Sequence, residues 1–216
     1  MFCFALFRNV VVYIHRMSLV HPYNRGNNVY KDEMNRRMME VITLEYSNLE
    51  ERMNLKVLAF DGIKQRTSRK LMNCGIKREN IRLIENDVDT FEIHDRNGFR
   101  CTFGNAKEIF AKKADMCYDI IVLDAIGEAK SIFGLMRLLI KNDYTKRNTI
   151  FISTFVRRCI KTSYSSSFRS CKSMLCRWLN IKIVDLCDSL SYGAPRNKQS
   201  NMITYFWQIK SNRIKF

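Results

Sequence analysis

A repeated alternation of short apolar runs with helical stretches constrains the fold of this chain more than any other feature of its sequence. The clearest run is YDIIVLDAIG (118–127), in which four apolar residues lie between Asp119 and Asp124. Continuous apolar runs of this kind are typical of strands that are buried on both faces of a sheet. When such strands alternate with helices, right-handed βαβ units and a mostly parallel sheet are expected.

The whole pattern predicts seven strands and six helical segments. The expected strands are 56–60, 80–85, 99–105, 118–127, 148–155, 181–190 and 201–210. The expected helical segments are 31–53, 65–75, 86–98, 106–114, 128–142 and 165–180. The loop SYGAPRNKQS, with Gly193 and Pro195, suits a connection between antiparallel strands. The sequence therefore predicts an α/β fold: a seven-stranded, mostly parallel sheet with helices on both faces and a C-terminal antiparallel strand pair.

The length of 216 residues fits one domain with a short appendage. We divide the chain into an N-terminal extension, 1–54, and a domain, 55–216. The segment 31–53 of the extension has the spacing of an amphipathic helix. The apolar stripe of this helix, which we expect to face the core, consists of Met34, Met38, Val41, Ile42 and Leu49.

The first sixteen residues are apolar but are interrupted by Arg8, and the run is too short to span a bilayer, which needs about 20 residues. They also lack the pattern of a signal peptide. A core or edge strand, a weak membrane-surface segment and an extension upstream of a start at Met17 are all open, and we expect a peripheral element without a catalytic role. The eight cysteines form no C-x-x-C pair and no cluster with histidine. No metal or redox site is indicated, and an intracellular protein of the cytoplasm or nucleus with reduced cysteines is expected.

The charge of the chain is strongly asymmetric. The net charge is +16, and from Lys141 to Phe216 there are 15 basic and 3 acidic residues, so about +12 lies in the last third. Such an excess favours a surface that faces a polyanion, although a merely soluble basic surface is the alternative. The candidate nucleic-acid-binding residues alternate with Tyr164, Phe168 and Trp178, and are Arg157, Arg158, Lys161, Arg169, Lys172 and Arg177.

Several strands of this predicted sheet end in acidic or polar residues, at Asp61, Glu85, Asn105 and Asp124. In this order and spacing the chain resembles the class I, Rossmann-like, S-adenosylmethionine-dependent methyltransferases, as a divergent member. The resemblance covers about 56–210 and rests on no single motif. It implies S-adenosylmethionine as the cofactor and a methyl transfer as the activity.

The resemblance also implies a role for each strand end, because ligands of open parallel sheets bind beyond the carboxyl ends of the strands. Glu85, which is 23 residues after Gly62 by subtraction, would bind the ribose hydroxyls. Asp124 would lie beside the sulfonium and the target, and is the catalytic candidate. Phe60, Asp61 and Gly62 would pass beneath the methionine part, and the adenine would contact Gly104, Asn105 and Ala106.

Plainer interpretations of these residues remain open. Asp61 and Gly62 form a common turn pair, Glu85 suits a solvated strand end, and Asn105 suits the N-cap of the next helix. Asp124 is the exception, because a carboxylate after four apolar strand residues costs desolvation free energy unless something uses it.

The chain departs from the methyltransferase pattern in its first loop. Residues 61–66 read Asp-Gly-Ile-Lys-Gln-Arg, so a Gly-x-Gly loop is absent and the side chains of Ile63 and Lys64 are expected to crowd the ligand. Ala-Ile-Gly follows Asp124 in place of an Asn/Asp-Pro-Pro-Tyr/Phe motif, and no Pro-Cys pair offers a nucleophile for cytosine methylation.

The sequence favours two functions for the chain over a third. The first is a methyltransferase that acts on nucleic acid, and the alternative is a catalytically inactive relative that serves as a nucleic-acid-binding or assembly subunit. A methyltransferase of small molecules or proteins is a weaker third hypothesis. The low content of Pro and Gly, with abundant Lys, Asn, Ile and Phe, hints at a virus or parasite.

Overall fold

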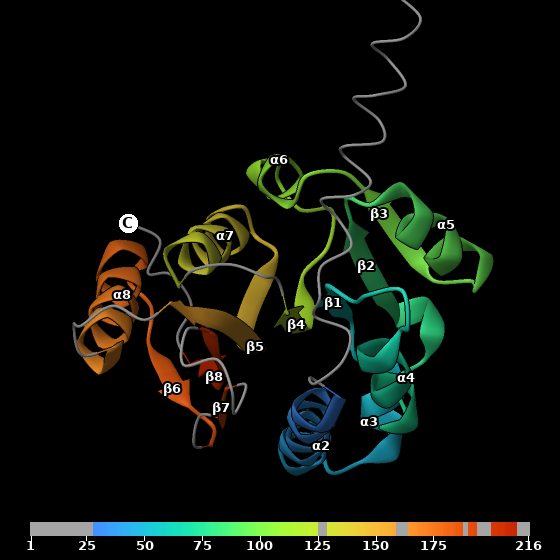
Figure 1. The fold of residues 1–216 in the computed structure, drawn as a ribbon, viewed down its shortest axis with the longest axis horizontal. Coiled ribbons are helices and arrows are strands. Elements are labelled where there is room, and N and C mark those ends of the chain that lie inside the picture. The colour runs from blue at the N-terminus through green and yellow to red at the C-terminus, as the bar shows by residue number, and fades with distance from the viewer. Residues whose placement is uncertain (1–27, 125–128, 159–163, 188–189, 194–199, 211–216) are drawn as a thin grey trace, which may run out of the picture.

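The computed structural model describes residues 28–124, 129–158, 164–187, 190–193 and 200–210. These residues form an eight-stranded sheet with helices on both faces (Figure 1). The strands are β1 (Val57–Ala59), β2 (Ile81–Glu85), β3 (Arg100–Phe103), β4 (Tyr118–Leu123), β5 (Thr145–Arg158), β6 (Ile183–Asp185), β7 (Leu190–Gly193) and β8 (Ser200–Ile209). The helices are α2 (Asn28–Glu45), α3 (Leu49–Asn54), α4 (Arg66–Asn73), the 3-10 helix η2 (Arg78–Asn80), α5 (Val88–Arg96), α6 (Ala106–Ala111), α7 (Ala129–Lys141) and α8 (Tyr164–Leu179). None of the helices in the described ranges combines the length and apolar character needed to cross a bilayer.

The strand order is β3-β2-β1-β4-β5-β8-β6, and β7 also pairs with β8. Strands β1 to β5 are parallel to their neighbours among themselves, whereas β8 runs antiparallel to β5, β6 and β7. Strands β6 and β7 pair with successive parts of β8, at 207–209 and 201–204, so the eight strands fill seven positions. The predicted fold class is confirmed. The expected strand 181–190 is interrupted after Asp185, and the expected loop 191–200 is wrong at its start, because 191–193 belong to β7 and pair with β8.

The core is divided between the two faces of the sheet. In β4, Ile121 and Leu123 pack on the side of α7 and α8, whereas Ile120 and Val122 pack on the side of α2 and α4. This division follows from the strand itself, because successive side chains point to opposite faces. Both faces of β4 are therefore buried, as its continuous apolar run predicts.

Helix α2 contributes most of its expected apolar stripe to the core. The stripe residues that are at most 4% exposed are Met34, Met38, Val41 and Ile42. The prediction for Leu49 is wrong, since 54% of this residue is exposed. The expected helix 31–53 is two helices, because the side chain of Asn48 accepts a hydrogen bond from the Glu50 amide and starts α3. Leu49 is therefore the first residue of a new helix and is out of phase with α2.

Candidate cofactor site

A pocket of about 500 Å³ lies at the carboxyl ends of β1 to β4. Strand β1 lies between β2 and β4, so the pocket is at the point where the strand order changes direction, which is where open α/β sheets bind ligands. Its lining includes all eight residues predicted from the sequence for cofactor binding and catalysis. These are Phe60, Asp61, Gly62, Glu85, Gly104, Asn105, Ala106 and Asp124, and the lining also contains Ile84, Asn86, Lys107, Ser131 and Leu135.

Asp61 holds the first loop against helix α4. Its carboxylate oxygen Oδ2 accepts hydrogen bonds from the backbone N–H and the hydroxyl of Ser68, both at 2.7 Å. The other oxygen, Oδ1, accepts the N–H of Gly62 at 3.0 Å. The residue before the helix, Gln65, makes no side-chain cap. Asp61, seven residues before Ser68 in the sequence, takes this role and accepts an N-terminal amide of α4. The buried carboxylate thus fixes the shape of the loop.

A buried histidine braces the same loop from the side of α5. The amide Nε2 of Gln65 lies 3.1 Å from Nδ1 of His94, and Nε2 of His94 lies 3.1 Å from the carbonyl oxygen of Asp61. Because the Gln65 amide nitrogen donates, the two contacts fit a neutral ring that carries its proton on Nε2. Gln65 itself has a left-handed backbone (φ 52°), a conformation that glycine usually supplies. The brace gives the loop a physical means of holding this turn without glycine.

Gly62 faces the open space of the pocket, because a Cβ added there would meet no atom within 4 Å. The side chains of Ile63 and Lys64 lie outside the pocket lining, and Ile63 is 52% exposed. The crowding expected from these two residues is therefore not seen. The loop keeps the pocket clear by directing its bulky side chains away from the sheet.

The ends of β2 and β3 form the far wall of the pocket. Oε1 of Glu85 accepts the N–H groups of Asn86 and Asp87, at 2.7 and 2.9 Å. Gly104 needs its glycine, since φ is +142° there. The side chain of Asn105 accepts the N–H of Lys107 at 2.9 Å, so Asn105 is the N-cap of α6. Its amide nitrogen makes no hydrogen bond within the described part of the chain, and Asn105 is part of the pocket lining.

Asp124 forms an ion pair with Lys31, which comes from the first turn of α2. The carboxylate side chain is 10% exposed and the lysine side chain 24% exposed. Burial lowers the pKa of Lys31, the negative charge of Asp61 opposes this shift, and the positive charge of Arg66 adds to it. No local sequence signal marks Lys31, because one charge among many in a helix does not reveal a partner 93 residues away.

The six residues predicted to bind nucleic acid are only partly described. Lys161 and the side chains of Arg157, Arg158 and Arg169 lie outside the described part of the structure. Lys172 of α8 pairs with Asp185 at 2.8 Å. Arg177 is exposed, and neither it nor Lys172 lines the pocket. Nucleic-acid binding by these six residues stays a prediction.

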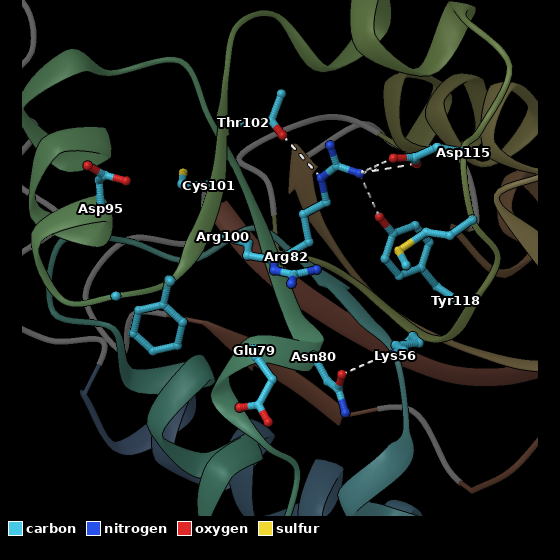
Figure 2. A pocket seen from close by; sticks show the side chains of 13 residues that line it. Lys56, Glu79, Asn80, Arg82, Asp95, Arg100, Cys101, Thr102, Asp115 and Tyr118 are labelled. Carbon is cyan, nitrogen blue, oxygen red and sulfur yellow. Dashed lines mark hydrogen bonds and ion pairs between the residues drawn. The ribbon is translucent and has the colours of Figure 1, made fainter.

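A second pocket, of about 540 Å³, lies at the opposite edge of the sheet, where the amino ends of β1 to β4 meet (Figure 2). Its three basic residues are matched by three acidic ones, namely Lys56, Arg82 and Arg100 against Glu79, Asp95 and Asp115. Arg82 already donates to Asp115 and Thr102 at 3.2 Å and to the Tyr118 hydroxyl at 3.4 Å. Burial alone would lower the pKa of Arg82, but its contacts with Tyr118 and Asp115 raise it on balance. This pocket is better suited to joining β2, β3 and β4 than to holding a ligand.

Replacing Arg82 by Met is expected to lower the free energy of unfolding by about 1–2 kcal/mol. The hydroxyls of Thr102 and Tyr118 lose a charged donor, whereas the apolar stem of the side chain is kept. The pair with Asp115 adds little, since that carboxylate is 70% exposed. Urea unfolding measures the change. Arg100→Met is the matched control in the same pocket and should stay within about 0.5 kcal/mol of the wild type. Equal losses in both variants would contradict the structural role of Arg82.

No metal site adds to these pockets, because the described residues contain no group of three or more His, Cys, Asp or Glu side chains that could hold an ion. No protein-family model matches the sequence, and no curated protein matches it.

Solved structures match the fold of the chain. A candidate methylase from Haemophilus influenzae has a TM-score of 0.55 at 11% identity, over 82% of this chain and 99% of that one. A candidate methyltransferase from Escherichia coli has a TM-score of 0.55 at 13% identity, over 83% and 85% of the two chains. The TYW2 protein of M. jannaschii, solved in complex with AdoMet, has a TM-score of 0.53 at 10% identity, over 76% of each chain. The chain therefore has the fold of the class I methyltransferases, as the predicted resemblance implied.

Proposed function

We propose that this chain, with its class I methyltransferase fold, binds S-adenosylmethionine at the carboxyl ends of its strands and transfers the methyl group to nucleic acid. One observation carries the proposal: residues from four separate strand ends, chosen from the sequence alone, line one pocket. A volume of about 500 Å³ is within the range of about 300–1,000 Å³ that small-molecule sites have. The open space at Gly62 also suits a ligand that passes close to the backbone.

In this proposal each wall of the pocket binds one part of the cofactor. Glu85 accepts hydrogen bonds from the ribose hydroxyls through Oε2, because the following backbone amides engage Oε1. Asn105 offers its amide nitrogen to the adenine, since its oxygen caps α6. The loop of Phe60, Asp61 and Gly62 supports the methionine part.

Asp124 and Lys31 are the residues that would handle the target. Bound S-adenosylmethionine supplies an electrophilic methyl group on a sulfonium. Asp124 accepts a hydrogen bond from the target N–H or O–H and so orients its lone pair. Lys31 holds Asp124 in place through their ion pair, so that this carboxylate is positioned to accept the proton that the target loses.

Nucleic acid is the proposed target because the chain carries a net charge of +16, which favours a polyanion over a neutral small molecule. Trp178 of α8 supports this choice. It is 61% exposed, and Cζ of Arg137 lies over its ring, 5.2 Å from the centroid. The exposed ring offers a surface for stacking with a base.

The ion pair between Lys31 and Asp124 favours a second candidate function. A carboxylate whose charge is neutralised within the chain is what an inactive relative would also have. Such a protein would bind polynucleotide in a salt-dependent manner, with no effect of S-adenosylmethionine on the affinity. An effect of the cofactor on polynucleotide binding would exclude this candidate.

Titration with S-adenosylmethionine tests the proposed pocket. Glu85→Gln is expected to weaken cofactor binding about 10- to 150-fold, because hydrogen bonds to a charged group contribute about 1.5–3 kcal/mol. Glu79→Gln, the same change at the opposite edge of the sheet, should leave the dissociation constant unchanged. Calorimetric binding that is equal in the wild type and both variants would contradict the ribose role of Glu85, and no binding by the wild type would contradict the cofactor itself.

A further inference from the structure

Two adjoining hollows lie along α4 and share no lining residue with the cofactor pocket. Each has a volume of about 400 Å³, and Arg69 lines both. The first is lined by Asp32, Lys64, Arg66, Arg69 and Lys70. The second is lined by Gln65, Arg69, Met72, Arg78, Arg96, Asn97, Gly98 and Phe99. We call these two hollows together the α4 surface.

The α4 surface carries an excess of positive charge. Its lining contains six basic residues and one acidic residue, Asp32, so its formal charge is 6 − 1 = +5. Arg78 donates to the carbonyl oxygen of Asn97 at 3.1 Å, and Arg96 lies 3.9 Å from the Glu92 carboxylate.

Four of the six cations on the α4 surface differ in having no such partner. Across the described residues, no ion pair or side-chain hydrogen bond is made by Lys64, Arg66, Arg69 or Lys70. Arg66, Arg69 and Lys70 are spaced at i, i+3 and i+4, so α4 brings them to one side. Like charges held this close repel one another, which costs free energy unless a counter-charge binds.

We propose that the α4 surface binds the sugar-phosphate backbone of nucleic acid. Four of its six cations are arginines, whose planar guanidinium groups bind phosphate oxygens in pairs. Two hollows that share Arg69 suit successive phosphates of one strand. Concave sites favour a chain of protruding phosphates over the flat surface of a membrane.

This inference rests on the proposed nucleic-acid partner but not on cofactor binding. It adds a surface on the face of the sheet opposite α7 and α8, whereas the predicted basic residues of the last third include Lys172 and Arg177 on α8. The α4 surface begins directly after the loop that Asp61 and His94 hold, because Lys64 of this surface follows Gly62 of the cofactor pocket by two residues.

The test compares two triple variants with the same change in net charge. The first, Lys64→Gln/Arg69→Gln/Lys70→Gln, removes three unpaired cations of the α4 surface. The control, Lys112→Gln/Lys141→Gln/Arg147→Gln, removes three exposed cations that line neither hollow. Thermal unfolding checks that both variants are folded, and S-adenosylmethionine titration checks that the cofactor pocket is intact.

Binding is measured with fluorescein-labelled 20-nucleotide single strands of RNA and DNA between 50 and 300 mM NaCl. Each phosphate contact contributes about 0.7 to the slope of log K against log salt, so three lost contacts should reduce the slope by about 2. Extrapolated from 1 M salt, this corresponds to about 100-fold weaker binding at 0.1 M. The control variant should keep the slope of the wild type.

The binding measurements separate a failure of the α4 surface from a failure of the proposed nucleic-acid partner. Equal slopes for both triple variants would overturn the α4 surface while leaving the nucleic-acid partner intact. No binding of either strand by the wild type would overturn the partner as well. Displacement of the labelled RNA by phosphatidylserine vesicles at the same phosphate concentration would assign the α4 surface to an anionic membrane and overturn the proposal.

Discussion

The Asp124→Asn variant is expected to transfer methyl groups about 10²- to 10⁴-fold more slowly than the wild type while still binding S-adenosylmethionine. The amide keeps the size of the side chain but loses the charge that orients the target. It also leaves Lys31 without its counter-ion at a partly buried position. Single-turnover transfer from radiolabelled cofactor to RNA or DNA, with cofactor affinity measured separately, gives the two quantities.

Asp115→Asn is the matched control for this variant, because it makes the same chemical change at an exposed position on the opposite edge of the sheet. Its transfer rate should equal that of the wild type. An Asp124→Asn variant that is as active as this control would exclude a catalytic role for Asp124. A wild type that binds the cofactor and transfers nothing to either polymer would favour the inactive, nucleic-acid-binding candidate.

The second large effect, after that of Asp124→Asn on methyl transfer, is expected for Asp61→Ala. This substitution should lower the free energy of unfolding by about 2–4 kcal/mol. The substitution leaves the buried amide and hydroxyl of Ser68 without an acceptor and removes the distant cap of α4. Lys31 also loses the negative charge that opposes the lowering of its pKa by burial. Urea unfolding measures the loss.

Ser68→Ala provides the comparison, because it removes the hydroxyl bond and keeps the bond from the backbone N–H. It should cost about 1 kcal/mol, clearly less than Asp61→Ala. Equal costs for the two substitutions would mean that the backbone bond contributes nothing. Asp61 would then be free to serve the ligand directly instead of the loop.

The fold was largely predictable because most of its elements have a local signal. Strand β4 is continuously apolar, so both faces of it are buried. The strand-end residues met in one pocket because parallel strands bring their carboxyl ends to the same edge. Local signals also explain the errors, since the helical spacing of 31–53 continues through Asn48, where a side-chain cap starts a new helix.

Two parts of the candidate sites depend on tertiary packing and had no local signal. Lys31 meets Asp124 only because α2 packs against α4 and β8, which brings its first turn to the residue that follows β4. The α4 surface combines Arg69 with Arg78 and Arg96, which belong to three different helices. A count of charge by thirds of the chain directs attention to the last third instead, where charges are numerous but Lys172 is already paired.

The loop after β1 has a consequence for how a ligand would bind. A glycine-rich loop samples many shapes and is ordered when its ligand arrives, which costs conformational entropy at that moment. In this chain, His94, Gln65 and Asp61 fix the turn through buried hydrogen bonds within the protein itself. Part of the entropic cost has then been met during folding, so ligand binding is expected to show a smaller entropic penalty. The shape of the loop is fixed by the polar side chains of Asp61, Gln65 and His94 instead of by glycines.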